Sequence, residues 1–445
     1  MSNENGILNL LSNLISIITV NDPFRNIRPS RNAVDRIKAL IDEALDLDSK
    51  LFENNGYYTI YNVVGSGKPI VLFLAHYDTV PVNISEWIYD PFKLTVKGSK
   101  AYGRGAADDK GNIVAIVYAL REVLKEKFCG TIIYAFTGDE EIGGRNGTLA
   151  FRHLLEKKGL LPDFVVNGDG SGLIPIVRRR NTFIITISVP EEKIIVKGRR
   201  VGGMFKVRIC AKETRHSAYF MPGVDSHPLL ALSEYLRYKR NLFLINLSGS
   251  WVKSNVIPSR VTFNAVKKGS GNEYEVDVSL TKLIRSLIII SRMNVKTELD
   301  SDYGVTINPN IYVYKDGVHT IKIDVRAMSK KLPNTVHERI KSIFSNIGLT
   351  KVDIKIKDGS GYLYTEEDSY LVRQALDVQK MLSLEEAVCE LAGASDSRFF
   401  SPLGIQCIDY GPTGGNVHGP NEYVNIKSLV KAKNFYAKLA QKILK

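Results

Sequence analysis

The stretch LFLAHYDTVPV, residues 72–82, decides how the rest of the chain is interpreted. Its first four residues are apolar and predict a buried strand, which ends in His76 and Asp78 and cannot continue as a central strand past Pro81. Side chains two apart on a strand point to the same face, roughly 6–7 Å apart, so the imidazole and the carboxylate share one face. The pair fits either a hydrogen-bonded structural pair or a metal ligand with the residue that orients it. This stretch alone leaves both interpretations open.

Length and composition predict a globular protein with two domains. A chain of 445 residues exceeds the size at which a single core usually divides. Its 44% hydrophobic and 24% charged residues are typical of soluble proteins, and no apolar run reaches the roughly 20 residues that span a bilayer. Residues 1–20 predict an amphipathic helix and not a signal peptide. Four cysteines without a CxxC pair exclude a zinc ribbon and favour a reducing, cytoplasmic location.

The formal net charge of +13 admits nucleic acid or another acidic surface as a partner. The basic residues are spread along the chain, however, and the densest clusters, at 178–180 and 198–200, are short. A nucleic-acid-binding module is therefore the less favoured alternative, and it predicts salt-sensitive association with DNA or RNA. We expect neither a nucleic acid nor a membrane as partner.

The first 170 residues alternate predicted strands with predicted helices. The runs at 69–75, 131–136 and 163–166 are continuously apolar, which is typical of strands covered on both faces. Helical spacing of apolar residues predicts helices over 112–128 and 147–159. The fold class is therefore α/β, with a mostly parallel sheet and helices on both faces.

The pattern changes near residue 175. The runs at 204–212, 260–266 and 320–328 alternate apolar and polar residues, as expected of strands with one solvated face, and 280–293 is helical. The glycine-containing stretches GDGSG and KDGSG bracket this region and are plausible hinges. We therefore predict an α+β domain over residues 176–362, inserted into a first domain made of residues 1–175 and 363–445.

Polar side chains recur where apolar strands of the first domain end. Besides His76 they are Asp108, Asp109, Glu140, Glu141, Asp169 and His418. In an open α/β sheet, sites form outside the carboxyl ends of the strands. These residues lie in five stretches of the chain, four of which follow the end of a predicted strand. We therefore expect their side chains to lie close together.

Histidines and carboxylates in one cluster suit zinc. If one carboxylate bridges two ions, the ligands are His76, Asp108, Glu141, Asp169 and His418. Glu140 is then free to act as general base toward a water molecule whose pKa the metal lowers. Without cations, so many carboxylates together would repel one another. The alternative is that these residues lie on separate, solvated loops.

Five blocks of sequence carry a resemblance to a known family. They are HYDTVP (76–81), GRGAADDKG (103–111), GDEEIGG (138–144), GASDSRF (393–399) and VHGPNEYV (417–424). In this order they resemble the di-zinc exopeptidase family that includes acetylornithine deacetylase, succinyl-diaminopimelate desuccinylase, aminoacylase and glutamate carboxypeptidase. The resemblance implies a zinc exopeptidase-like catalytic domain over residues 1–175 and 363–445. It also implies an enlarged, ferredoxin-like lid or dimerisation-like domain over 176–362.

The resemblance also implies roles for the strand-end residues. His76 binds one zinc ion, and Asp78 holds its imidazole and counts among the catalytic residues. Asp108 bridges the two ions, and the peptide bond from it to Asp109 is cis. Asp169 stands where the family places an acidic ligand of the first ion.

For the second ion, the resemblance implies Glu141 and His418 as ligands, with Glu140 as the catalytic base beside them. The loop GPTGG, with Gly414 and Gly415, matches a loop near the substrate carboxylate.

In the lid, the resemblance implies that His216 stabilises the tetrahedral oxyanion, and that Asn255 and Arg326 bind substrate. Two plainer alternatives stay open: Asn255 caps a turn, and Arg326 serves an ion pair within the lid. Asn255 and Arg326 are separated here by a whole αβ unit, whereas family members usually place the two blocks close together. In dimeric family members the lid histidine enters the partner's active site, whereas some monomeric members have an enlarged lid that supplies it within one chain. The lid here is of intermediate to large size, so the resemblance leaves both open: His216 acts from the partner subunit of a homodimer, or within its own chain in a monomer.

The sequence predicts a zinc-dependent hydrolase that cleaves an amide bond next to a free carboxylate, like the N-acyl amino acid deacylases and succinyl-diaminopimelate desuccinylase. A dipeptidase or carboxypeptidase of the same family is the alternative, and a catalytically silent binding homologue is the alternative from another class. The resemblance implies two Zn²⁺ per subunit, which Co²⁺ can replace, and an acylated amino acid or short peptide as substrate.

Overall fold

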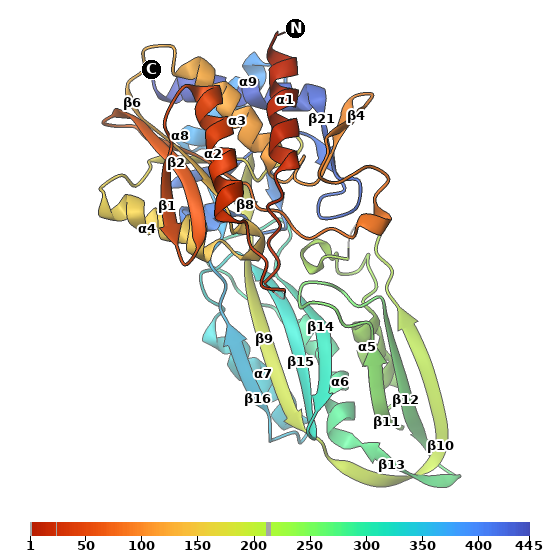
Figure 1. Ribbon diagram of the computed structural model, residues 1–445. Helices are drawn as coiled ribbons and strands as arrows, with labels where there is room; N and C mark the ends of the chain where they lie inside the picture. Colours follow the sequence, from red (N-terminus) through yellow and green to blue (C-terminus); the bar gives the residue numbers. More distant parts are fainter. Residues whose placement is uncertain (1, 24, 211–214) are drawn as a thin grey trace. The chain divides into compact units, whose positions relative to one another are not determined.

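A computed structural model describes residues 2–23, 25–210 and 215–445 (Figure 1). The chain divides into two compact units, the first made of Met1–Arg179 and Tyr362–Lys445 and the second of Arg180–Gly361. The sequence places the bounds of the inserted part at 176 and 362. Within the described ranges, no helix combines the length and the apolar character needed to cross a bilayer.

The first unit is organised by one large mixed sheet. Among the described residues, its strands follow the order β1-β2-β6-β3-β7-β19-β8-β17, with β18 beside β8. They are β1 (Lys50–Asn54), β2 (Tyr57–Ser66), β3 (Ile70–His76), β6 (Gly130–Thr137), β7 (Phe164–Asn167), β8 (Ile176–Arg179), β17 (Leu363–Tyr364), β18 (Cys389–Leu391) and β19 (Gln406–Asp409). The central strands β6, β3, β7 and β19 are parallel, whereas β1, β2 and β17 pair antiparallel at the edges. The predicted α/β class is confirmed; the sheet is parallel at its centre and between β18 and β8, and antiparallel at its β1-β2 edge and between β8 and β17.

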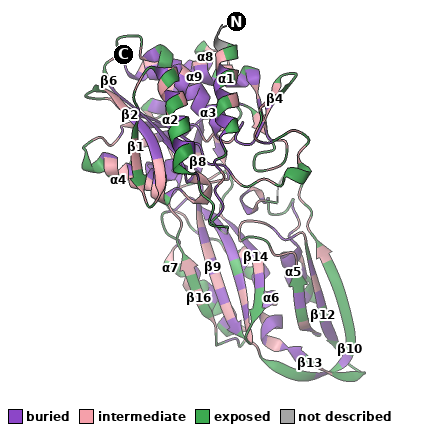
Figure 2. Cartoon of the chain, viewed as in Figure 1, coloured by how far each residue is buried: buried purple, intermediate pink, exposed green. Residues whose placement is uncertain are grey.

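Helices cover both faces of this sheet, as β3 shows. Every residue of β3 is buried. Residues 71, 73 and 75 enter one apolar cluster, and residues 70, 72 and 74 enter another. The first cluster includes α1 (Ser2–Ser16), α2 (Arg31–Leu45), α3 (Lys110–Val123), α8 (Tyr370–Met381) and α9 (Ile426–Ile443), and the second includes α4 (Ala150–Lys157). Figure 2 shows the outcome: α3 and α9 are largely buried, whereas α2 keeps an exposed face.

A small second sheet of the first unit joins segments that are more than 300 residues apart. Its order is β20-β21-β5-β4. The strands are β4 (Thr95–Lys97), β5 (Lys100–Tyr102), β20 (Gly414–Gly415) and β21 (Tyr423–Asn425). The antiparallel pairing of β21 with β5 places the loop that precedes α3 next to the loop between β20 and β21 (Figure 1). These two loops carry Asp108 and His418.

The second unit contains two four-stranded sheets in its described residues, in the orders β14-β15-β9-β16 and β11-β12-β10-β13. Its strands are β9 (Asn181–Pro190), β10 (Lys193–Lys206), β11 (Leu242–Gly249), β12 (Arg260–Lys268), β13 (Asn272–Asp277), β14 (Thr306–Lys315), β15 (Val318–Ala327) and β16 (Asp353–Lys357), and its helices are α5 (Pro228–Tyr238), α6 (Val278–Ser291) and α7 (Asn334–Asn346). Alternate residues of β9 are buried and pack with these helices in one core. This unit is the predicted α+β part of the fold.

One strand of the second unit differs from its prediction. The alternation over 204–212 predicts a strand, but β10 begins at Lys193 and ends at Lys206. Its partner strand β12 begins at Arg260, which pairs with Lys206, so the ladder ends there. The chain then turns, and Arg208 pairs with Ser226. Residues 211 and 212 lie outside the described residues.

His227 is a structural residue of the second unit, where it begins α5. Its side chain is 2% exposed. Its Nδ1 accepts a hydrogen bond from the backbone N–H of Leu229 at 3.2 Å, and its Nε2 lies 3.0 Å from Oδ1 of Asn310. Because Nδ1 accepts, the neutral ring carries its proton on Nε2 and donates it to Asn310. Burial lowers the pKa of His227 to about 4.

We expect acid to destabilise the second unit through His227. The unfolded histidine has a pKa of about 6.5, so the unfolded chain binds more protons than the folded one between pH 4 and pH 6.5. The stability that the neutral, buried His227 contributes is complete above pH 6.5 and is lost as the pH falls toward 4. The free energy of unfolding is lowered in this way by about 2 kcal/mol at pH 4.5. In a Trp87→Phe background, Trp251 is the remaining tryptophan and its fluorescence follows unfolding of this unit in urea.

The matched control is His227→Asn, which keeps a capping acceptor but does not titrate. Its loss of stability relative to the parent should be smaller at pH 4.5 than at pH 7 by about 2 kcal/mol. Equal losses at both pH values would show that His227 is not held neutral by its burial.

Candidate metal centre

Parallel strands bring the predicted residues to one edge of the sheet. His76 is the last residue of β3. Strand β6 leads into the short 3-10 helix η2 (Glu140–Ile142), and Asp169 is the second residue after β7. Because β3, β6 and β7 are parallel neighbours, their carboxyl ends lie at the same edge.

Asp108 lies between two histidines. Its Oδ1 is 2.9 Å from Nε2 of His76, and its Oδ2 is 2.9 Å from Nε2 of His418. The same nitrogen of His418 is 3.0 Å from Oε2 of Glu141. The two oxygens of this carboxylate therefore face two different histidines.

A divalent cation fits this group of side chains. One ligand atom each from Asp108, Glu141 and His418 can be chosen so that all lie within 4.8 Å of one another. Carboxylate oxygens with an imidazole nitrogen are a donor set that zinc accepts. The side chain of His418 is 53% exposed, so the group is open to solvent on that side.

Asp78 holds the first histidine and the turn that carries two glutamates. Its Oδ1 is 3.3 Å from Nδ1 of His76, and that nitrogen is also 3.0 Å from the Asp78 backbone oxygen. The carboxylate accepts hydrogen bonds from the backbone N–H groups of Glu140 and Glu141, each at 3.2 Å, and from Nδ2 of Asn21 at 2.9 Å. Fully buried, Asp78 fixes the orientation of the imidazole and the start of η2 together.

Asp169 is held by the buried Arg179. Nη2 of Arg179 lies 3.5 Å from Oδ1 of Asp169 and also bonds to its backbone oxygen, while Nε of Arg179 lies 2.5 Å from Oδ2 of Asp409. Burial raises the pKa of Asp169 to about 7, although Arg179 acts in the opposite direction. Asp169 is not among the three residues of the close group. The charges of Asp108 and His76 nevertheless act on it: Asp108 raises its pKa and His76 lowers it.

Glu140 lies in a buried, acidic environment. Burial raises its pKa well above the ordinary value, and the charges of Asp169 and Asp396 raise it further. Nη1 of Arg398 lies 3.7 Å from its Oε1, and Nη2 of Arg398 bonds to Oδ1 of Asp396 at 2.9 Å. A carboxyl group whose pKa is moved toward neutrality is suited to take up and return a proton.

Arg398 and Asp396 lie next to Glu140, and the sequence assigns no role to either of them. Both belong to the block GASDSRF, which points to the site without saying what its side chains contact. Thr148 donates a hydrogen bond to the second oxygen of Asp396, so the acid is held between a hydroxyl and a guanidinium.

The peptide bond between Asp108 and Asp109 is cis, as the resemblance implies. The Asp109 carboxylate is buried and accepts hydrogen bonds from the backbone N–H of His76 at 3.2 Å and from Nδ2 of Asn112 at 2.7 Å. It therefore ties the end of β3 to the start of α3.

Gly414 and Gly415 form β20, in the hairpin that carries His418. A Cβ on Gly414 would lie 2.6 Å from Cβ of Ala107, and one on Gly415 would lie 2.8 Å from the hydroxyl of Tyr423. A side chain at position 414 would therefore displace the residue that precedes Asp108.

In the second unit, two predicted residues lie together. The side-chain amide of Asn255 is 3.1 Å from Nε2 of His216, and the backbone oxygen of Asn255 accepts a hydrogen bond from Ser217 at 2.8 Å. Nδ1 of His216 accepts a hydrogen bond from the backbone N–H of Ala218, so His216 caps the 3-10 helix η4 (Ser217–Tyr219). His216 is thus held at both ring nitrogens.

Arg326 makes a bidentate ion pair within β15. Its Nε and Nη2 donate to the two oxygens of Asp324 at 2.9 and 3.1 Å, and both residues are buried. This contact is the ion pair within the inserted domain that the sequence left open as the alternative role of Arg326.

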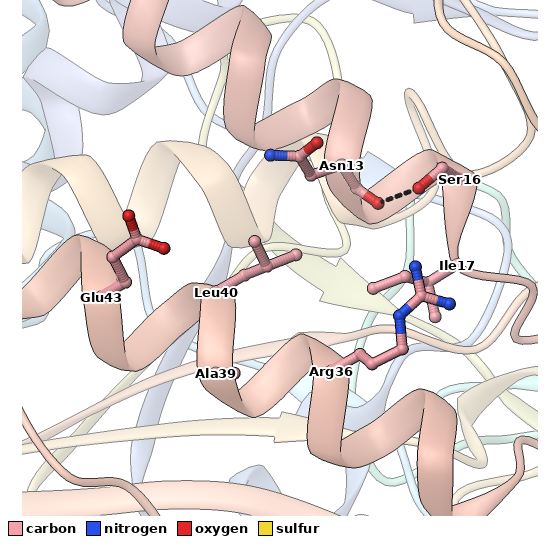
Figure 3. Close-up of a pocket in the computed structure, with 7 residues that line it drawn as sticks. All are labelled: Asn13, Ser16, Ile17, Arg36, Ala39, Leu40 and Glu43. Atoms are coloured by element: carbon pink, nitrogen blue, oxygen red, sulfur yellow. Dashed lines mark hydrogen bonds between the residues drawn. The ribbon is translucent and has the colours of Figure 1, made fainter.

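A surface cavity of the first unit is separate from this centre. It encloses about 330 Å³ and lies against α1 and α2 (Figure 3). Its lining residues are Asn13, Ser16, Ile17, Arg36, Ala39, Leu40 and Glu43. None of these is a predicted site residue.

Comparison with known proteins places the chain in a family. The model of Peptidase family M20/M25/M40 matches residues 72–442. Succinyl-diaminopimelate desuccinylase of Thioalkalivibrio sulfidiphilus is 23% identical over 385 residues, which cover 85% of each chain. The enzyme of the same name from Polynucleobacter necessarius is 24% identical over 384 residues, covering 85% of this chain and 84% of that one.

Solved structures show the same fold. Aminoacylhistidine dipeptidase from Vibrio alginolyticus aligns with a TM-score of 0.68 at 14% identity, over 98% of this chain and 96% of that one. The M20 metallo-carboxypeptidase Sso-CP2 from Sulfolobus solfataricus gives 0.62 at 18% identity, over 97% and 98%. YXEP of Bacillus subtilis, a dinuclear metal-binding peptidase of the M20 family, gives 0.52 at 14% identity, over 100% and 99%. The family match covers most of the chain and confirms the resemblance seen in the sequence: the chain belongs to Peptidase family M20/M25/M40 and is a metallohydrolase that acts on amide or peptide bonds.

Proposed function

We propose that this chain is a two-zinc hydrolase that cleaves an amide bond next to a free carboxylate, with an N-acylated or N-succinylated amino acid as substrate. The observation that carries the proposal is Asp108, whose two oxygens each face a different histidine at 2.9 Å. The desuccinylase relatives support the substrate class. We assign His76, Asp108 and Asp169 to one ion, and Asp108, Glu141 and His418 to the other.

Glu140 is the proposed acid and base. Two divalent cations held by these ligands would polarise the scissile carbonyl and lower the pKa of a water molecule. Glu140 takes a proton from that water and returns it to the nitrogen of the leaving amine. Its backbone N–H is fixed by Asp78, and Arg398 approaches its carboxylate from the side of Asp396. These two contacts hold Glu140 on its backbone and its carboxylate sides.

The second unit is proposed to act as the lid. We assign oxyanion stabilisation to His216. Because its Nδ1 accepts a hydrogen bond from Ala218, the neutral ring carries its proton on Nε2, which lies 3.1 Å from the side-chain amide of Asn255, so this role requires that the N–H turn from Asn255 to the oxyanion. Arg326 is proposed to bind the substrate carboxylate together with Asn255, Gly414 and Gly415. For Arg326 this role requires that its ion pair with Asp324 leaves a guanidinium N–H available, since a guanidinium has five donors.

A hydrolysis screen distinguishes the substrate classes. Purified protein with added Zn²⁺ or Co²⁺ is assayed with N-acetyl amino acids, N-succinyl-diaminopimelate, unblocked dipeptides and C-terminally extended peptides. We expect the highest kcat/KM for the acylated or succinylated compounds, and an amide analogue that lacks the free carboxylate should be poorly cleaved. Preference for dipeptides or extended peptides would support the dipeptidase or carboxypeptidase alternative. Full occupancy by metal without hydrolysis of any class would support a silent binding homologue.

His216→Ala is expected to lower kcat by about 10²-fold or more with a smaller change in KM, because an oxyanion donor acts mainly in the transition state. Steady-state kinetics at saturating metal measure both constants. His337→Ala, at a half-buried surface position of α7, is the control and should retain activity. A kcat within threefold of the wild type would remove His216 from the mechanism.

Co-expression of His216→Ala with Glu140→Gln tests which subunit supplies the histidine. Each variant alone lacks one of the two groups. Activity restored in the mixed sample means that His216 acts across a homodimer, whereas no restoration means that it acts within its own chain.

A further inference from the structure

Glu422 is a fully buried acid that binds the loop of one proposed ligand and lies in the loop of another. Its side chain is 0% exposed. Oε1 accepts hydrogen bonds from the backbone N–H groups of Ala107 at 2.9 Å and Asp108 at 3.0 Å. Oε2 accepts from Gly105 at 3.1 Å and from Nη1 of Arg104 at 2.5 Å. One carboxylate thus collects four donors from residues 104–108.

The same residue ends the loop that carries His418. Glu422 follows His418 by four positions, and its backbone oxygen accepts a hydrogen bond from Gly103 at 3.0 Å. Arg104, which binds the Glu422 carboxylate, also donates from Nη2 to the backbone oxygen of Gly419 at 3.1 Å. The two loops are therefore joined at three points: through a carboxylate, through a guanidinium and through the backbone.

The loop between β20 and β21 has a backbone that needs such support. His418 itself has φ +62°, and Asn416 and Asn421 also have positive φ. Non-glycine residues in this region are uncommon and are held by their surroundings. The Asn421 side chain accepts a further hydrogen bond from the backbone of Ile88 at 2.8 Å. The position of His418 thus depends on contacts that its own loop does not supply.

We propose that Glu422 is a positioning residue of the metal centre, which sets the separation between Asp108 and His418 before any cation binds. The inference rests on the proposed function, because it takes these two side chains as metal ligands. Glu422 does not face the metal ligand atoms itself. It acts through the backbone N–H of Asp108 on one side and through Arg104 and the Gly419 carbonyl on the other. Such outer contacts commonly change metal affinity by about 10–100-fold.

Glu422→Gln tests the proposal with little change in shape. Both carboxylate oxygens of Glu422 accept hydrogen bonds only from donors. In a glutamine one oxygen becomes an NH₂ group, which is itself a donor, so it would face either the guanidinium and Gly105 or the N–H groups of Ala107 and Asp108 without forming those hydrogen bonds. Isothermal titration of metal-stripped protein with Zn²⁺ alone is the main measurement. We expect the weaker of the two sites to lose about 10-fold or more in affinity. The visible absorption of the Co²⁺-loaded variant should also change.

Asp42→Asn is the matched control. Asp42 lies in α2 of the same unit and accepts hydrogen bonds from Ser49 and Lys38, away from both ligand loops. Its substitution should lower the melting temperature without changing either zinc affinity. If Glu422→Gln behaves in the same way, with both affinities within twofold of the wild type, Glu422 is only a structural residue and the proposal is wrong.

Arg104→Lys is a second variant that keeps the charge beside Glu422. A lysine can pair with the carboxylate but cannot also reach Gly419 in the geometry of a guanidinium fork. We expect it to weaken one of the two zinc sites at least fivefold, with the other affected less than twofold. Equal or absent effects on the two sites would contradict the proposal. If the wild-type protein itself fails to bind two Zn²⁺, the proposed function and this inference fail together.

Discussion

Glu140→Gln is expected to reduce kcat by about 10³-fold or more while both metal ions stay bound, since general acid–base groups contribute up to about 10⁴. The substitution keeps the size of the side chain but removes its ability to take up a proton. The backbone N–H of Glu140 still bonds to Asp78, so the turn that also presents Glu141 should stay in place. Loss of turnover would therefore report on chemistry and not on assembly of the site.

Three measurements make this result interpretable. Metal content by elemental analysis should equal that of the wild type, and the melting temperature should not fall. Glu126→Gln, a surface change of the first unit, is the control for handling and should be fully active. A Glu140→Gln enzyme with more than a tenth of wild-type kcat and full metal content would exclude Glu140 as the base.

Asp108→Asn is expected to lower bound zinc from two ions to at most one and to reduce kcat/KM by about 10³-fold or more, because a bridging carboxylate neutralises charge on both ions. Its two oxygens lie 2.9 Å from His76 and from His418, and an asparagine would turn an NH₂ group toward one of them. The protein should still fold, since the backbone N–H of Asp108 keeps its bond to Glu422.

Asp35→Asn, an exposed substitution in α2, is the control for this experiment and should leave metal content unchanged. Elemental analysis after exhaustive dialysis gives the stoichiometry. Two ions retained in Asp108→Asn at wild-type affinity would mean that the cations lie elsewhere in the protein.

The sequence contained enough information for the parallel centre of the sheet and for which side chains to inspect. Continuous apolar runs predicted β3, β6 and β7, because strands buried on both faces tolerate few polar residues. Polar residues directly after such runs then had to lie at one sheet edge. His76 and Glu141 could be grouped on that basis without any knowledge of distances.

Other parts of the site could not be read from the sequence. Arg398 and Glu422 act on segments that the fold brings together across 258 and 314 positions of the chain, and no local pattern encodes those contacts. The end of β10 was misplaced because alternation describes a strand but not the length of its partner. The ion pair of Arg326 with Asp324 is the exception: residues two apart on a strand share a face, so this contact was foreseeable as an alternative.

We propose that five side chains of the first unit hold a pair of divalent cations. The decisive experiment is a crystal structure of the zinc-loaded protein, with anomalous differences collected on both sides of the zinc absorption edge. We predict two peaks per chain, one beside His76 and Asp169 and the other beside Glu141 and His418, with the Asp108 carboxylate contacting both. A single peak, or peaks bound by other residues, would contradict the account.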